Sequence, residues 1–332
     1  MIVGNSLKVY FGVEDPSVQF GTVPAEATHR IKVANESLQA KYNKKDEGLL
    51  TGGIATGRVS TMSRKVEGAL STLLRPDDSS LLFYLLLGVE TTQAASGAGG
   101  DSLTHTYGPI GTELTDSLPS CTIGFDRTIE KDLFTGCKVV SMSFSAQQED
   151  YVKVDMNLVG SRRLVQEMTG AKALKPSPQA AFKFLGGEFK IKGEHVADVT
   201  NIKFDYNNNL DANIMTCDSG EFFIEPECGA RDLKLDIDVL YSQASLKLKE
   251  QYYDTDDDFA VSLHFSSAEK AKDGENFKVD IEIPAVQVIE LSSSVGGPEK
   301  VIQKMSMKAI ENFTDPLITV SVHNNVTETY NA

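Results

Sequence analysis

The sequence predicts a mainly β (α+β) protein of two tandem β-sandwich domains, each with one flanking short helix. The first observation is that residues 137–161 alternate apolar and polar side chains in two runs around the polar turn 147–150. This is the pattern of a β-hairpin with one buried and one solvated face. The second observation is that residues 304–325 show two similar runs near the C-terminus. About half of the chain therefore looks duplicated.

Further matches between the two halves occur in the same order along the chain. Residues 142–146 match 305–309 at an offset of 163 residues, 38–43 match 202–207, and Val66, Gly68 and Leu70 match Leu235, Ile237 and Val239. A fixed order of matches favours an internal duplication. Chance similarity between two antiparallel β domains is the alternative explanation.

The first half divides into an N-terminal arm, 1–28, and a first domain, 29–165. The arm contains Pro16 and Pro24, and its alternating apolar residues favour one added strand. Asp78 to Leu87 is predicted to be a helix because N-cap residues precede an apolar run and Gly88 follows it. The other expected elements are strands at 31–42, 66–70 and 120–129, a Gly-rich loop at 43–65 and a surface loop at 91–118.

The second half divides into a Pro-containing linker, 166–181, and a second domain, 182–332. Its order of elements resembles that of the first domain. The expected elements are strands at 199–208, 233–241 and 277–284 and a helix-like segment at 242–252.

Composition excludes several classes of protein. The net charge of −15 argues against a protein that binds nucleic acid by neutralising phosphates, and the acidic excess is concentrated in residues 166–332. The longest apolar run, 81–87, is too short to span a bilayer, and the N-terminus lacks the pattern of a secretory signal. The four cysteines lack metal-ligand spacing, which favours reduced thiols and leaves a disulfide open.

No motif indicates catalysis, a cofactor or a metal. Residues 52–59 resemble a phosphate-binding loop but carry Arg58 and Val59 where Lys and Ser or Thr are required. The acidic run 254–258 resembles a calcium loop but lacks its glycine and final glutamate. The five histidines lack ligand spacing, although a cluster in space stays open. We therefore predict a protein that is not an enzyme.

The order of elements resembles the tail tube proteins of long-tailed, siphovirus-type bacteriophages. The similar segments are 29–53, with an early strand and long loop, and 63–92, with a V-x-G-x-L strand at Val66–Leu70 and a helix from Pro76-Asp77 to Leu87-Gly88. The hairpin at 138–162 is similar to the paired strands that end a tube domain. The second half departs from this pattern because it lacks a clear V-x-G-x-L.

The resemblance implies a structural subunit of the virion tail that is made in the cytoplasm of the bacterial host. Strands of neighbouring subunits would form an inner β-barrel, and rings would stack into a hollow tube through which DNA passes without specific binding. One-domain tube proteins form hexamers, so two domains per chain imply a trimer with pseudo-sixfold symmetry. The implied partners are further copies of the chain and the tape measure, tail terminator and distal tail proteins, with no membrane.

The predicted site residues follow from this resemblance and from acidic side chains on the solvated faces of strands. Asp155, Asp236, Asp238, Asp280 and Glu282 are predicted to line the lumen, although ordinary solvated sheets look the same. Leu49, Leu50, Ile54 and Arg58 are predicted to contact the next ring. The alternatives are the inner tube of a contractile tail or injection machine, a β-rich adhesin or carbohydrate-binding module, and a hydrolase with a clustered pocket.

Overall fold

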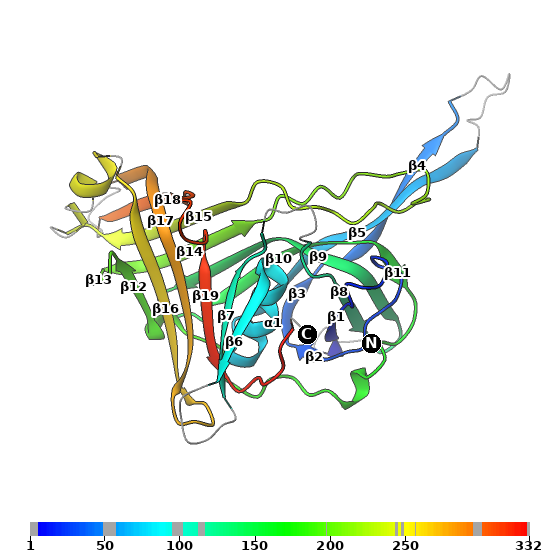
Figure 1. Cartoon of the computed structure of the whole chain (residues 1–332), viewed down its shortest axis with the longest axis horizontal. Coiled ribbons are helices and arrows are strands. Elements are labelled where there is room, and N and C mark those ends of the chain that lie inside the picture. Colours follow the sequence, from blue (N-terminus) through cyan, green and yellow to red (C-terminus); the bar gives the residue numbers. More distant parts are fainter. Residues whose placement is uncertain are drawn as a thin grey trace.

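The structure is a computed structural model, described here for residues 6–48, 58–94, 102–111, 117–196, 198–242, 245–246, 249–255, 257–294 and 301–330. Strands dominate these residues, and the longest helix has 12 residues. The mainly β prediction is confirmed (Figure 1).

A central antiparallel sheet runs through both halves of the chain. Its strands alternate buried and solvated residues, so one face packs on the core and the other is polar. In spatial order the strands are β4 (Gln39–Asp46), β5 (Val59–Leu73), β10 (Lys153–Gly160), β9 (Lys131–Gln147), β14 (Val199–Asn207), β15 (Asp232–Leu240), β18 (Ile302–Ala309) and β17 (Asn276–Ser294), and β3 (Val33–Glu36) also pairs with β5.

Two outer sheets cover the core, and each shares one long strand with the central sheet. The first is ordered β2 (His29–Ile31), β1 (Lys8–Val13), β8 (Cys121–Asp126), the first part of β9 and β11 (Arg162–Leu164). The second is ordered β13 (Glu194–His195), β12 (Gly187–Ile191), β16 (Phe259–Lys270), the first part of β17, β19 (Thr319–Asn324), β7 (Leu103–Pro109) and β6 (Gly88–Ala94). β9 and β17 therefore each serve two sheets.

The strand pairings of the first half recur in the second half in the same order. In the first half the order of pairing is β4–β5–β10–β9, and β9 also pairs with β8 and β11. In the second half the order is β14–β15–β18–β17, and β17 also pairs with β16 and β19. Even the irregularities match, since a β-bulge falls at Val140 of β9 and at Ile289 of β17. The pairs on either side of the bulge are Ser141 with Asn157 and Val139 with Leu158, or Glu290 with Ser306 and Val288 with Met307.

The pairings correct three expectations. Residues 304–325 do not form a hairpin, because β18 pairs with β15 and β17 whereas β19 pairs with β17 and β7. The equivalent of β9 is therefore β17, so the offset of 163 compares strands that are not equivalent. The predicted loop 91–118 contains the end of β6 and all of β7, which pair as a hairpin. Alternation identified strand faces but not strand partners.

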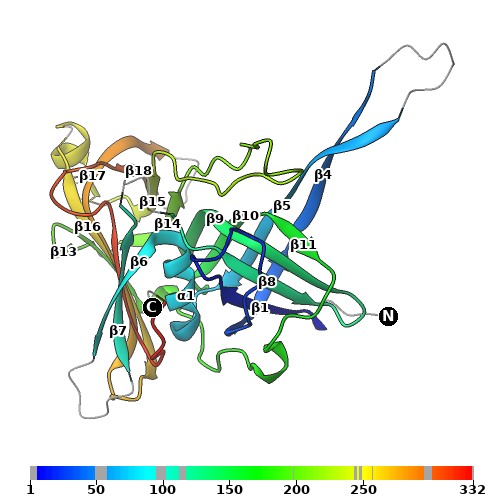
Figure 2. The same ribbon diagram turned by 45° about the vertical axis from the view of Figure 1, so that its right-hand side comes forward.

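Helix α1 (Pro76–Leu87) confirms the predicted helix, but it lies inside the molecule. Its residues are buried except for Asp77, and it packs on β6, β7, β9 and β19 (Figure 2). The helix begins at Pro76 and ends where Gly88, at φ 93°, donates its N–H to the Tyr84 carbonyl. In the predicted second helix, 245–246 are α-helical and η4 (Lys249–Tyr253) is a π-helix. Two 3₁₀ turns are η2 (Ala171–Ala173) and η3 (Phe184–Gly186).

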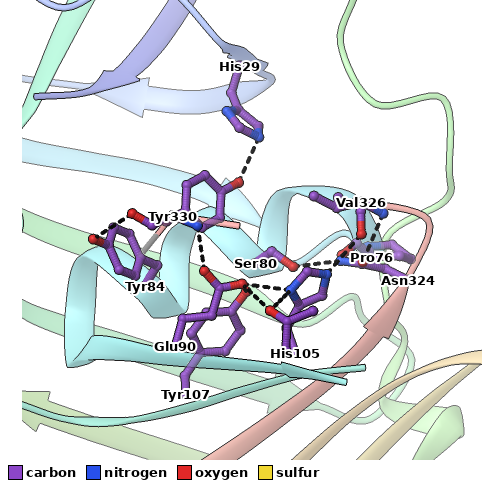
Figure 3. A network of polar contacts seen from close by, with 11 residues as sticks. His29, Pro76, Ser80, Tyr84, Glu90, His105, Tyr107, Asn324, Val326 and Tyr330 are labelled. Atoms are coloured by element: carbon purple, nitrogen blue, oxygen red, sulfur yellow. Dashed lines mark hydrogen bonds and ion pairs between the residues drawn. The ribbon is translucent and has the colours of Figure 1, made fainter. Parts of the chain in front are cut away.

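The end of the second half is tied to the first half by a buried polar network (Figure 3). Tyr330 donates its backbone N–H to Glu90 Oε2 at 2.6 Å, and its hydroxyl lies 2.9 Å from His29 Nε2. His105 lies between Glu90 Oε1 at 2.7 Å and the Val326 carbonyl at 2.9 Å. Burial raises the pKa of Glu90, but the hydrogen bonds from His105 and Tyr330 outweigh it and leave that pKa lowered.

Gly68 of β5 gives a test of the close packing at the start of β4. A Cβ on Gly68 would lie 2.5 Å from Leu38 Cα, so Gly68→Ala should destabilise the fold by about 1–3 kcal/mol. Gly108→Ala is the matched control, because a Cβ there would meet nothing within 4 Å. Urea unfolding measures both variants, and equal losses of stability would contradict this account of Gly68.

His29 gives a test of the buried network. Burial lowers its pKa to about 4, so between pH 6.5 and 4 the unfolded state binds more protons and stability falls as the pH falls. His29→Gln should remove up to about 1.4 kcal/mol per pH unit of this slope. Burial raises the pKa of Asp78 to about 7, which acts in the opposite sense, so the variant is compared with the wild type at each pH.

The measurement for His29 is urea unfolding at several pH values from 4 to 7. His195→Gln serves as the control, because this side chain is 51% exposed. The difference between wild type and His29→Gln should change with pH by more than that of the control. A constant difference for both variants would show that His29 remains solvated in the folded protein.

Candidate assembly surface

The central sheet ends in two open edges. β4 pairs with β5 on one side, and residues 289–294 of β17 pair with β18 on one side. Within the described residues, no strand pairs with the other side of either segment. Unpaired backbone N–H and C=O groups along an edge favour pairing with another chain. The two edges therefore form a candidate surface for assembly.

The junction between the two halves shows how such edges join. β14 pairs with the edge of β9 that faces away from β10, with Asn207 opposite Ser141 and Asp205 opposite Ser143. Because Asn208 donates its N–H to the Val140 carbonyl at 2.8 Å, Asn207 and Ser141 form a non-hydrogen-bonded pair. By their pairings, β14 is equivalent to β4 and β9 to β17. The junction inside the chain thus joins the equivalents of its two open edges.

The polar face of the central sheet carries balanced charge. Between the register shifts of β4 and β9, direct cross-strand pairing puts seven carboxylates and seven lysines on it, and Lys45 and Lys138 lie beyond those shifts. They are Glu67, Asp155, Asp205, Asp232, Asp236, Asp238 and Glu290, and Lys41, Lys65, Lys153, Lys203, Lys234, Lys304 and Lys308. Ion pairs join Lys41 to Glu67 at 2.7 Å and Lys308 to Asp232 at 2.9 Å.

The five acidic residues predicted for the lumen do not share one surface. Asp155, Asp236 and Asp238 lie on the polar face, where serine hydroxyls donate to Asp155 at 2.5 Å and to Asp236 at 2.6 Å. Asp280 and Glu282 lie on the first part of β17, which pairs with β16 and β19 in the second outer sheet. The five residues lie on two sheets because β17 passes from one sheet to another, and their place in a lumen stays a prediction.

Three of the four predicted stacking residues, Leu49, Leu50 and Ile54, lie outside the described residues, and Arg58 is exposed just before β5. The predicted loop 43–65 is partly strand, since β4 extends to Asp46 and β5 begins at Val59. These strands form a hairpin that projects from the body (Figure 1). The sequence did not reveal this hairpin because its residues are mostly solvated on both faces, so no buried face marks the strands.

The segment 208–231, which joins β14 to β15, lies over the first half at the point where β9 bends. Asn208 is buried and its amide donates to the carbonyls of Val139 and Leu86. Lys138, whose side chain is fully buried, donates to Glu225 at 2.6 Å. Burial lowers the pKa of Lys138, while the bond to Glu225 opposes that shift. Sequence reasoning missed this contact, because nothing near Lys138 marks it as buried.

The titratable residues of the described part of the chain form no metal-holding cluster. They contain no group of three or more His, Cys, Asp or Glu side chains placed to hold a metal. His29 and His105 do meet in one network, but both bind the chain end there. All four cysteines are free, although Cys121 and Cys137 are direct cross-strand neighbours. None of the helices described has the length and apolarity needed to span a membrane.

Comparison with known proteins agrees with this reading of the sheet. Residues 4–309 match a protein family described as phage tail tube protein, and no match was found among curated proteins. The matched region contains the whole central sheet, with both open edges and the polar face. The chain therefore belongs to the phage tail tube protein family and is a structural protein of the virion tail.

Proposed function

We propose that three copies of this chain close into a ring with pseudo-sixfold symmetry, and that stacked rings form a tube through which viral DNA passes during ejection. The observation that carries the proposal is that the two open edges are equivalent to the two strands joined inside the chain. Repeating the internal junction between copies adds domains in one direction, and a head-to-tail contact of this kind closes by rotation. Six domains in a ring correspond to three copies.

The polar face of the central sheet is proposed to line the lumen, including Asp155, Asp236 and Asp238. Lysines without partners would bind DNA phosphates and release counterions, which would retard passage. Here each lysine lies among carboxylates, as Lys203 lies 2.5 Å from Asp205. Balanced charge therefore supports a wall that neither binds DNA nor repels it strongly. Asp280 and Glu282, on the outer sheet, are not proposed for the lumen.

The proposed partners are further copies of the chain within and between rings, and the tape measure, tail terminator and distal tail proteins at the ends of the tube. A long non-contractile tail follows from the resemblance of the first half. A monomeric adhesin with an aromatic-lined site does not require two unpaired sheet edges. Such edges favour pairing with another chain, so they support the tube over the adhesin.

Ala40→Pro tests the contact between copies. Ser37 donates its N–H to the Ala69 carbonyl in β5, so odd-numbered residues here bond to β5 and the N–H of Ala40 points to the open edge. Proline removes that donor without removing a bond to β5, so the variant should fold as a monomer and form no rings. Ala40→Ser keeps the donor and should assemble normally.

Negative-stain microscopy and sedimentation measure the assembly of these variants, and circular dichroism with thermal unfolding checks that they fold. Wild-type particles should have masses that are multiples of three chains of 36.1 kDa. Normal rings from Ala40→Pro, or wild-type rings built from a number of chains other than three or its multiples, would reject the proposed closure.

The charge balance of the wall gives a second test. Changing Asp155, Asp236 and Asp238 to Asn leaves lysines of the polar face without enough carboxylates, so assembled tubes should retain a short DNA duplex at low salt and release it as salt rises. Changing Asp280 to Asn and Glu282 to Gln is the matched control on the outer sheet. Fluorescence anisotropy of labelled DNA compares them. Equal retention by both sets of tubes would contradict the lumen assignment.

A further inference from the structure

The structure also assigns the register of the contact between copies. We infer that β4 of one copy pairs with residues 289–294 of β17 in the next copy, with Lys41 opposite Glu290 and Ala40 opposite Leu291. This inference rests on the proposed function and adds the residue pairs that recognise one another.

The first step aligns β17 with β9 through their shared irregularity. The bulge at Ile289 matches the bulge at Val140, an offset of 149 residues. The next residues follow, so Glu290 is equivalent to Ser141 and Leu291 to Met142. A bulge fixes register because it can occupy only one position along a strand pair.

The second step aligns β4 with β14 through the strands beside them. Ala69 of β5 pairs with Asn157 of β10, and Asp236 of β15 pairs with Ser306 of β18. Asn157 and Ser306 are equivalent because they lie opposite Ser141 and Glu290. Ala69 is therefore equivalent to Asp236, an offset of 167 residues. Glu67 is then equivalent to Lys234. Their partners in the edge strands are Gln39 and Asp205, so these two residues are equivalent. It follows that Ala40 is equivalent to Tyr206 and Lys41 to Asn207.

The third step transfers the internal junction to the edges. Asn207 lies opposite Ser141 and Tyr206 opposite Met142. The equivalent pairs are Lys41 with Glu290, Ala40 with Leu291 and Gln39 with Ser292. The N–H of Tyr42 would donate to the Ile289 carbonyl, as Asn208 does to Val140. Tyr42 is 49% exposed and Ile289 is 53% exposed, so each has apolar surface that the contact would cover.

The chemistry of these pairs agrees with the register. Ala40 and Leu291 both lie on the core face, whereas Lys41 and Glu290 lie on the polar face. Glu67 already contacts two lysines, Lys41 and Lys65. Glu290 makes no ion pair within the described part of the chain. Lys41 can therefore turn to Glu290 of the neighbour while Lys65 keeps Glu67 paired.

A shift of two residues keeps the faces matched but loses this charge pair. It would place Gln39 opposite Glu290, or Lys41 opposite Ser292. A shift of one residue would place Lys41 beside the core-facing residues of the neighbour's β17. The alternation of buried and polar residues on both strands excludes it. The alternatives to be distinguished by experiment are therefore two-residue shifts.

Disulfide trapping tests the register directly. The background carries Cys217→Ser and Cys228→Ser, which leaves only the buried Cys121 and Cys137. In this background, Gln39→Cys with Ser292→Cys places two thiols in a predicted non-hydrogen-bonded pair, whose side chains are the closer kind. Oxidation of assembled protein should give linked dimers and trimers on a non-reducing gel. Gln39→Cys with Glu290→Cys is the control for a two-residue shift and should link poorly.

Charge reversal gives an independent readout. Lys41→Glu or Glu290→Lys alone should raise the protein concentration needed for assembly about two- to five-fold, and combining them should restore it. Rings that link through the control pair and not through the predicted pair would overturn the register and leave the tube proposal standing. Failure of the wild-type protein to form rings under any condition would instead reject the proposed function.

Discussion

The hydrogen-bonding requirement of strand edges is the constraint on which the rest of this structure depends. β9 and β17 each leave the central sheet at a bulge and continue in an outer sheet, so one strand satisfies partners in two layers. The central part of β9 still needs a partner on its far side, and β14 supplies it. The same part of β17 has no such partner among the described residues. The chain therefore forms this junction once internally, between β9 and β14. The equivalent strands, β17 and β4, lie unjoined at the two edges of the central sheet.

The junction inside the chain is supported by further contacts between the two halves. β6 and β7 follow α1 in the first half, yet β7 pairs with β19 and extends the outer sheet of the second half. In the opposite sense, Tyr330 of the second half forms hydrogen bonds with His29 and Glu90 of the first half. Segment 208–231 adds a third link through Lys138 and Glu225. Three sets of contacts besides the pairing of β14 with β9 therefore join the two halves.

Sequence reasoning predicted well where one local signal determines the outcome. The apolar run after Pro76 and before Gly88 predicted α1, and alternation around the turn 147–150 predicted the pairing of β9 with β10. It failed where the outcome depends on distant segments. Alternation at Lys304–Ala309 shows a strand with one buried face, but not that its partners are β15 and β17. Asp280 and Asp236 have the same local pattern, and only the bend of β17 separates their surfaces. Burial of Lys138 depends on a segment about ninety residues away.

The polar face of the central sheet differs in net charge from the rest of the molecular surface. The chain carries −15, yet the polar face of the central sheet carries as many lysines as carboxylates. The negative excess therefore lies elsewhere on the molecule. A lumen lined only by carboxylates would repel DNA, but closing it into a ring would bring like charges together and oppose assembly. Alternating charges avoid that cost. Because ionic screening acts within about 8 Å at physiological salt, the fields of neighbouring opposite charges cancel a short distance from such a wall. DNA near the axis of the proposed tube would then experience little net attraction or repulsion, and its passage would depend on the diameter of the lumen more than on its charge.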